Sequence, residues 1–275
     1  MSERDSIDKM TRGPNTVATL ISDFRDLGIS EGMTLLVHSS LSSLGWVCGG
    51  PVAVILALET ILTGEGTLVM PTHSGDWSDP ANWGNPPVPE SWWETIRNEM
   101  PAYSPDLTPS RGMGCIPETF RKQTGVVRSG HPLTSFAAWG KHKEFIVRDA
   151  SYDFSLNGQS PLGKVYDLDG SILLLGVDYP NNTSFHLAEY RADYKGKKRV
   201  PDGFPVLENG RRRWYQSEDI LYYPDDFPEI GTAFEKEHGI RTGMIGAGKA
   251  KLIKQRELVD FSVSWMERNR NLPEN

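Results

Sequence analysis

A histidine and a glutamate lie three positions apart in the segment 171–194, and this pair is able to carry out proton transfer. The apolar run 172–175 predicts a buried strand, and the turn residues after it predict a new helix with Thr183 as its N-cap. His186 and Glu189 then share one face of that helix. Such a corner of an α/β protein can hold a general base, but a lone histidine on a partly apolar helix is as often a hydrogen-bonded core residue. Both interpretations stay open at this point.

Two earlier segments show the same order of strand, polar loop and helix. The apolar run 34–37 leads into the serine-rich stretch 38–43, and Pro51 opens the helix that follows. The run 67–70 ends in a second polar loop, 71–74. Parallel strands place their carboxyl ends on one edge of a sheet, so these loops should meet there. The pattern predicts an α/β fold, a three-layer α/β/α arrangement with a largely parallel or mixed central sheet and long loop insertions.

The loops themselves carry groups that bind anions. The serine-rich stretch offers hydroxyls and the N–H groups of a helix start, which can hold a phosphate or an amide-rich chain. It lacks the Gly-x-x-x-x-Gly-Lys pattern and is not a P-loop. Arg111 begins a Gly-rich loop that leads to a helix opened by Pro117, and Arg128 lies beside another turn. Arginines at turns often bind anions, although a lone surface arginine is usually only solvated.

The stretch 74–110 does not follow the order of strand, polar loop and helix, and it contains four tryptophans and seven prolines. Proline excludes it from the central sheet, so we expect an insertion over the sheet with a short helix at 91–100. Its tryptophans either wall a pocket or only anchor a long loop. Farther on, Asn209-Gly210 predicts a β-hairpin. We expect a single domain over 1–275, with 1–13 as a flexible lead-in.

Composition excludes several classes of protein. The net charge of −7 argues against nucleic acid as a partner, and no apolar run is long enough to span a membrane. The N-terminal residues lack an apolar signal core, so we expect a cytoplasmic protein. Two cysteines, Cys48 and Cys115, have neither metal-binding nor redox spacing. We therefore expect a cytoplasmic, disulfide-free protein with a small-molecule ligand.

Seven motifs lie along the chain in a specific order and separation. They are V-H-S-S-L-S-S-L-G-W-V-C-G-G at 37–50, G-T-L-V-M-P-T at 66–72, R-G-M-G at 111–114, R-S-G-H-P-L-T-S-F-A-A-W-G at 128–140, N-G-Q-S-P-L-G-K at 157–164, L-L-L-G-V-D at 173–178 and T-S-F-H-L-A-E-Y at 183–190. With these motifs the chain resembles a known family, the aminoglycoside 3-N-acetyltransferases or antibiotic N-acetyltransferases, over nearly its whole length. The resemblance is strongest to the members from Bacillus-type bacteria, in the segments 83–90 and 139–143.

The resemblance implies acetyl transfer from acetyl-coenzyme A to an amine by direct attack on the thioester. In the best-known members the amine is the 3-amino group of a 2-deoxystreptamine antibiotic, and another branch acetylates amino-phosphonates. His186 would be the general base, and either Glu189 or the pair Asp225 and Asp226 would orient it or bind the substrate ammonium. Thr183 or backbone N–H groups would stabilise the oxyanion. The substrate ammonium groups would be bound by Asp76, Glu189, Asp225 and Asp226.

The family's coenzyme-binding loops correspond to thirteen residues here. They are His38, Ser39, Ser40, Leu41, Ser42, Ser43, Thr72, Arg111, Gly112, Met113, Gly114, Arg128 and Ser129. We expect no metal ion. For an enzyme of this size, a homodimer is the starting expectation for the oligomeric state. Two other classes stay open: a small-molecule binder without activity, and a metal-dependent hydrolase that uses His186 and Glu189 with a third histidine, either His38, His73 or His131.

Overall fold

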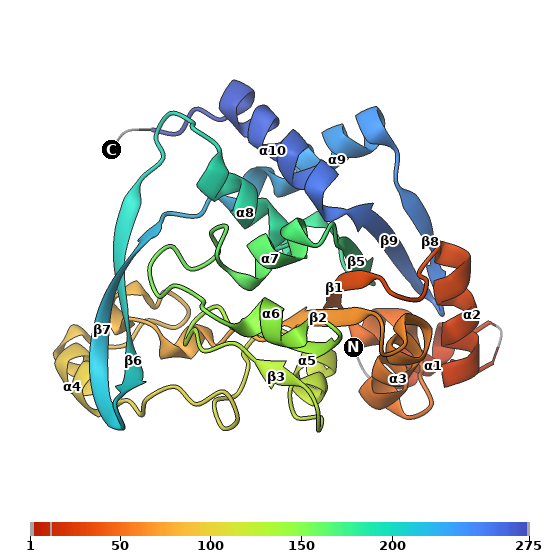
Figure 1. Cartoon of the computed structure of the whole chain (residues 1–275), viewed down its shortest axis with the longest axis horizontal. Helices are drawn as coiled ribbons and strands as arrows, with labels where there is room; N and C mark the ends of the chain where they lie inside the picture. Colours follow the sequence, from red (N-terminus) through yellow and green to blue (C-terminus); the bar gives the residue numbers. More distant parts are fainter. Residues whose placement is uncertain (1–2, 12, 274–275) are drawn as a thin grey trace.

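The structure, a computed structural model, describes residues 3–11 and 13–273 and is built around one seven-stranded sheet (Figure 1). Its strand order is β3-β4-β2-β1-β5-β9-β8. In the centre, β1 pairs in parallel with β2 and with β5. On both sides of this centre, each outer strand pairs with its neighbour in the antiparallel direction. The predicted α/β fold with a mixed sheet is confirmed. The strands are β1 (Thr34–Ser39), β2 (Thr67–Pro71), β3 (Val127–Arg128), β4 (Phe136–Gly140), β5 (Ser171–Leu175), β8 (Arg241–Ile245) and β9 (Gly248–Lys254).

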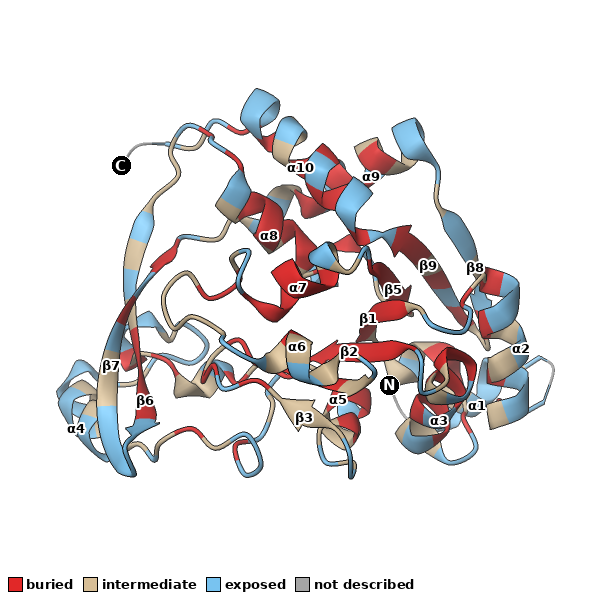
Figure 2. Cartoon of the chain, in the orientation of Figure 1, coloured by how far each residue is buried: buried red, intermediate tan, exposed pale blue. Residues whose placement is uncertain are grey.

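Alternate side chains of the central strands enter two hydrophobic layers, one on each face of the sheet. In β1, Leu35 and Val37 pack into the first layer and Leu36 into the second, as the period of two dictates. Figure 2 shows these central strands as the most deeply buried part of the chain. The helices that contribute to the first layer are α2 (Val17–Leu27), α3 (Gly50–Leu62) and α5 (Cys115–Phe120). Those of the second layer are α6 (Lys143–Val147), α7 (Pro161–Asp167), α8 (Ser184–Arg191), α9 (Phe227–His238) and α10 (Gln255–Asn269).

The N-terminal residues are more ordered than their sequence predicted. Residues 3–8 form the short helix α1 (Glu3–Asp8) instead of a loose lead-in. Two acidic residues in its first turn complement the helix dipole, and Trp46 Nε1 donates to Glu3 Oε1 at 3.2 Å. These interactions hold α1 beside the loop after β1. Met1, Ser2 and Arg12, which belong to the same prediction, lie outside the described residues.

Helix α2 begins one residue later than the sequence suggests. We expected Asn15 as its N-cap, but Thr16 caps it in a reciprocal pair with Thr19. Asn15 instead donates its side-chain amide to the Leu44 carbonyl at 2.8 Å, which attaches α2 to the loop after β1. Gly28 ends the helix in the left-handed conformation, with φ of 102°.

A separate hairpin of β6 (Arg199–Glu208) and β7 (Arg211–Ile220) stands at one side of the molecule, beside α4 (Trp93–Glu99) of the insertion (Figure 1). Asn209 and Gly210 form its turn, both with positive φ, and this prediction is confirmed. The insertion 74–110 packs against the hairpin, because the backbone N–H of Asp79 donates to the Asp202 carboxylate at 3.2 Å. The two segments together form one wall beside the sheet.

The tryptophans of the insertion make contacts within the insertion itself. Trp77 Nε1 donates to the Pro101 carbonyl at 3.0 Å, and Trp83 Nε1 donates to Ser78 Oγ at 2.9 Å. Trp92 is 56% exposed. These contacts support the interpretation that the aromatic residues anchor a long loop.

Candidate active site

The polar ends of β1, β2 and β5 lie side by side, because these three strands are parallel neighbours. The end of β5 touches the serine-rich loop directly. Gly176 has φ of 69°, and a Cβ atom there would lie 2.6 Å from the Cβ of Ser43. Only glycine allows this approach, which brings the loop after β1 next to the turn that leads into α8.

Thr183 occupies the N-cap position of α8, as predicted, but the side chain that accepts a free N–H there is that of Asn182. Asn182 accepts the N–H of Ser184 at 3.1 Å, whereas Thr183, at the N-cap position, makes no side-chain cap bond. Its hydroxyl is instead turned toward β1, with Oγ1 3.4 Å from Nε2 of His38. Thr183 is therefore placed between the end of β1 and the start of α8.

The predicted pair on α8 is in direct contact. Nδ1 of His186 lies 2.7 Å from Oε2 of Glu189. The Glu189 side chain is fully buried, and that of His186 is 18% exposed. Burial raises the pKa of Glu189, but the contact with His186, the N–H of Tyr223 and the charge of Arg270 bring it below its usual value. An ionised carboxylate only accepts hydrogen bonds, so Nδ1 must donate, and in the neutral imidazole Nε2 then keeps its lone pair.

Aromatic side chains fix the plane of the imidazole. The ring centroid of Tyr222 lies 4.5 Å from that of His186, and Phe227 contacts the imidazole edge-on at 5.1 Å. Behind them, Tyr190 and Tyr222 both donate to the buried carboxylate of Asp219. Sequence reasoning missed this group, because Asp219 lies near the end of β7, Tyr222 follows the hairpin, and no local motif connects them to α8.

A buried arginine completes the contacts of the pair. Arg270, the residue after α10, is 1% exposed in its side chain and donates from Nη1 to Oε1 of Glu189 at 2.7 Å. Its Nε and Nη2 donate to the two oxygens of Asp226, at 2.9 and 2.7 Å. The sequence carried no signal for Arg270, since a single arginine after an amphipathic helix is usually solvated.

The four predicted substrate carboxylates thus have different surroundings. Glu189 and Asp226 are joined through Arg270, and their oxygens are engaged by donors of the protein. Asp76 forms an ion pair with Arg111, and both side chains are about half exposed. Asp225 is exposed. Glu189 and Asp226 are therefore better suited to orienting the histidine than to binding a substrate.

A pocket of about 670 Å³ lies where the serine-rich loop meets the arginine–glycine loop. The loops approach closely, since a Cβ atom on Gly114 would lie 3.7 Å from the carbonyl oxygen of Ser39. Ser39 Oγ is a buried atom without a hydrogen-bond partner within the described part of the chain, so it can bond a ligand. Predicted coenzyme residues that line this pocket are Ser39, Ser40, Leu41, Ser42, Gly112, Met113 and Gly114.

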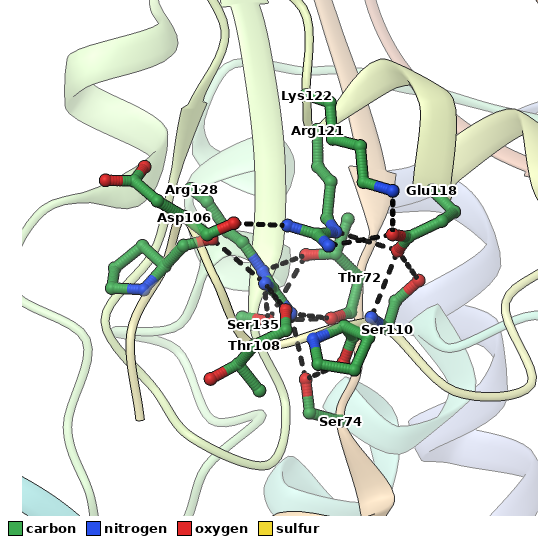
Figure 3. A network of polar contacts seen from close by, with 12 residues as sticks. Thr72, Ser74, Asp106, Thr108, Ser110, Glu118, Arg121, Lys122, Arg128 and Ser135 are labelled. Atoms are coloured by element: carbon green, nitrogen blue, oxygen red, sulfur yellow. Dashed lines mark hydrogen bonds and ion pairs between the residues drawn. The ribbon is translucent and has the colours of Figure 1, made fainter. Parts of the chain in front are cut away.

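Arg128 lies in a different environment, the polar network in Figure 3. Its Nε donates to Thr72 Oγ1 and Ser135 Oγ at 3.1 and 3.0 Å. Its other two nitrogens donate to the Thr72 carbonyl, Ser74 Oγ and the Thr108 carbonyl. All three nitrogens of Arg128 already have acceptors in the protein, and these belong to the residue after β2, the segment before β4 and the insertion. The network attaches the insertion to the sheet.

Three other predicted coenzyme residues are also bound within the protein. Ser43 donates its hydroxyl to Ser40 Oγ at 3.0 Å. Ser129 is 1% exposed and accepts the N–H of Phe136 at 3.0 Å. His38 is buried at the end of β1, beside Thr183 as described above. These three residues make contacts within the protein that hold the loops in place.

Two buried histidines near the site are held neutral. Burial, together with the neighbouring His186, lowers the pKa of His38 to about 3. Burial lowers the pKa of His131 to about 4, and its Nδ1 accepts the N–H groups of Leu133 and Thr134 at 3.2 and 3.0 Å. An acceptor cannot carry a proton, so the contacts of His131 require its neutral form.

Within residues 3–11 and 13–273, no three His, Cys, Asp or Glu side chains are grouped so that they would hold a metal ion. The third histidine that a metal-dependent hydrolase would need is thus not brought together with His186 and Glu189. The same residues contain no helix with the length and apolar character to cross a bilayer.

Comparison with known proteins decides the family. The model of the family described as "Aminoglycoside 3-N-acetyltransferase" matches residues 36–267. The chain belongs to this family. The aminoglycoside 3-N-acetyltransferases are acyltransferases, so the protein is an enzyme of the class that its sequence predicted.

Individual members of the aminoglycoside 3-N-acetyltransferase family are similar along the whole chain. The SPbeta prophage-derived aminoglycoside N(3')-acetyltransferase-like protein YokD of Bacillus subtilis (strain 168) is 48% identical over 260 residues, 94% of this chain and 95% of YokD. Aminoglycoside N(3)-acetyltransferase VII of Streptomyces paromomycinus is 36% identical over 273 residues, 94% of each chain. The similarity to Bacillus members is confirmed.

Solved structures of the family share the fold. The crystal structure of YokD has a TM-score of 0.94 at 46% identity and covers 98% of this chain and 100% of its own. AAC-IIIb, solved as a binary complex with CoASH, has a TM-score of 0.84 at 28% identity and covers 96% of this chain and 100% of its own. A member of this fold thus binds coenzyme A.

Proposed function

We propose that the protein transfers the acetyl group of acetyl-coenzyme A to the 3-amino group of a 2-deoxystreptamine aminoglycoside, with His186 as the general base. The observation that carries this proposal is the 2.7 Å contact between His186 Nδ1 and buried Glu189, which leaves Nε2 able to accept a proton. Membership of the family supports the reaction class. The names of the Streptomyces relative and of other family members support the aminoglycoside acceptor.

The proton transfer follows from the state of the attacking amine. An alkylamine is mostly protonated near neutral pH, and it must lose a proton to attack a carbonyl. That first proton passes to solvent, and the neutral amine then attacks. Nε2 of His186 accepts a second proton from the nitrogen as the C–N bond forms, and it returns this proton to the sulfur as the C–S bond breaks. Glu189 stabilises the imidazolium that exists between these two events. Acetyl-coenzyme A supplies an activated thioester, so no covalent intermediate on the protein is needed.

The coenzyme is proposed to bind in the pocket between the serine-rich and arginine–glycine loops. The hydroxyl of Ser39 and the N–H groups at the starts of α3 and α5 are donors that fit phosphate and pantetheine oxygens. Thr183 lies between the end of β1 and α8, and its hydroxyl is proposed to stabilise the oxyanion. The family member solved with CoASH supports this use of the fold.

One observation favours a second acceptor class. Two of the four predicted ammonium-binding carboxylates, Glu189 and Asp226, are engaged by Arg270. A site with fewer available carboxylates is less suited to a polycation and more suited to an amine that also bears an anionic group, such as an amino-phosphonate. The reaction and the role of His186 are the same for this acceptor.

The test is an assay of thiol release from acetyl-coenzyme A with 2-deoxystreptamine aminoglycosides in one panel and amino-phosphonates in another. NMR of the product then identifies the acetylated amine. We expect acetylation at the 3-amino group of the aminoglycoside. Turnover with amino-phosphonates alone would support the second acceptor class. Absence of coenzyme A binding in calorimetry would overturn the acetyltransferase proposal altogether.

A further inference from the structure

Arg270 joins three separate parts of the chain behind the proposed base. It follows directly after α10, and its side chain is 1% exposed. The guanidinium donates to Glu189 on α8, to Asp226 before α9 and to the backbone carbonyl of Tyr223 at 3.0 Å. The rings of Tyr194 and Tyr223 lie beside it, at 4.7 and 5.5 Å from Cζ. The whole side chain is thus held in one position.

These contacts determine the position of the Glu189 carboxylate. Its Oε1 accepts from Arg270 at 2.7 Å and from the N–H of Tyr223 at 2.8 Å, which turns Oε2 toward His186. Without the guanidinium, a fully buried carboxylate would lose its cation and one of its donors. It would then rotate or bind a proton, and the hydrogen bond to Nδ1 would no longer fix the imidazole.

The same guanidinium also holds the aromatic wall. Tyr223 follows Tyr222, whose ring contacts the His186 imidazole at 4.5 Å. Arg270 binds the carbonyl of Tyr223 and both oxygens of Asp226, so the segment 222–226 is attached to α10 at two points. Two of the contacts that orient His186, one polar and one aromatic, therefore depend on one residue near the end of the chain.

We infer that Arg270 is a positioning residue for acetyl transfer, which acts on His186 through Glu189 and the segment 222–226. This inference rests on the proposed function, in which His186 is the base. A purely structural role, in which Arg270 only attaches the C-terminal residues, would affect folding and leave the chemical step of the folded protein unchanged.

The experiment compares Arg270→Gln and Arg270→Lys with Arg121→Gln as a matched control. Arg121 is also buried, at 3% exposure, and forms a two-point ion pair with Glu118 on α5. For each variant, kcat, the KM for acetyl-coenzyme A, the Kd for coenzyme A and the melting temperature are measured. Rates are divided by the fraction of protein that binds coenzyme A, so that unfolded molecules are not counted.

For Arg270→Gln we expect kcat to fall about tenfold to hundredfold with coenzyme affinity within about twofold of the unaltered protein. Arg270→Lys should recover part of kcat, because it restores the charge but not the two-point contact. Arg121→Gln should lower the melting temperature without this loss of kcat. If Arg270→Gln does not fold, the kcat of the folded Arg270→Lys protein, compared with that of the unaltered protein, tests the inference instead.

Unchanged kcat in a folded Arg270 variant would overturn the inference, as would an equal loss of kcat in Arg121→Gln. The variant Glu189→Gln distinguishes a failure of the inference about Arg270 from a failure of the proposed function. Full activity of Glu189→Gln would contradict the proposed pair itself. Loss of activity in Glu189→Gln with full activity in Arg270→Gln would contradict only the role of Arg270.

Discussion

Nδ1 of His186 and Oε2 of Glu189 are 2.7 Å apart, one turn of α8 separates the two residues, and the carboxylate is fully buried. This contact sets the tautomer of the imidazole and directs the lone pair of Nε2 away from the protein's own carboxylate. The two residues therefore act as one unit, and replacing either one should slow the same step.

For His186→Ala we expect kcat to fall about hundredfold or more, with the Kd for coenzyme A nearly unchanged, since other loops line the pocket proposed for the coenzyme. Initial rates and calorimetry on the same preparation measure both quantities. A folded His186→Ala protein with full activity would end the assignment of His186 as the base.

Glu189→Gln should also lower kcat without affecting coenzyme affinity, because the amide can still accept from Nδ1 but cannot stabilise the imidazolium by its charge. Combining it with His186→Ala should cause little further loss, since both residues serve the same step. Additive losses in the double variant would show that the two residues act independently.

Replacing Ser39 should separate ligand binding from stability. Its hydroxyl is buried without a partner in the described chain, so Ser39→Ala breaks no hydrogen bond of the protein. We expect an unchanged melting temperature and about two- to tenfold weaker binding of coenzyme A. Ser262→Ala is the control, because that buried hydroxyl on α10 donates to Leu258 at 2.6 Å. Equal coenzyme affinity in all three proteins would argue against the proposed pocket.

Arg128→Lys tests whether the network in Figure 3 anchors the insertion. An ammonium group cannot reproduce the contacts of a planar guanidinium to six acceptors. We expect a melting temperature lower by several degrees and faster proteolysis within 74–110, with coenzyme affinity retained. The reverse result, weaker coenzyme binding at unchanged stability, would support the contact with coenzyme that the sequence predicted for Arg128.

Stability should fall in mild acid. The pKa of His38 is about 3 and that of His131 about 4 in the folded protein, against about 6.5 for an unfolded histidine. The unfolded chain therefore binds more protons between pH 6.5 and 4, and the free energy of unfolding decreases as pH falls through this range. Each group contributes at most about 1.4 kcal/mol per pH unit.

Urea unfolding at pH 7.5, 6.5 and 5.5 measures this dependence. His131→Asn is the informative variant, since its amide oxygen can accept the N–H groups of Leu133 and Thr134 without titrating. Its stability should vary less with pH than that of the unaltered protein. Parallel pH dependences would show that His131 does not titrate as described.

Sequence reasoning succeeded where structure depends on neighbours in the chain. The apolar runs of β1, β2 and β5, the Asn209-Gly210 turn and the shared face of His186 and Glu189 all follow from local periodicity and turn chemistry. The parallel order of the central strands followed from the repeated order of strand, polar loop and helix along the chain.

Sequence reasoning failed where a side chain has its partner far along the chain. Arg270 and Glu189 are 81 positions apart, and nothing in the sequence near either one reveals the ion pair. Arg128 was interpreted as an anion-binding residue because its neighbours form a turn, whereas its acceptors come from residues up to 56 positions away. A charge that is satisfied at long range looks, in the sequence, like a charge that is available to a ligand.

The contact between the hairpin and the insertion affects how specificity can be exchanged between family members. The insertion reaches the hairpin through Asp79 to Asp202 and through the N–H of Tyr103 to the carbonyl of Pro205, at 3.2 and 3.1 Å. A chimera that receives only residues 74–110 or only residues 199–220 from a relative would combine an insertion and a hairpin whose contacting residues come from different proteins. Grafting both segments together preserves these two contacts.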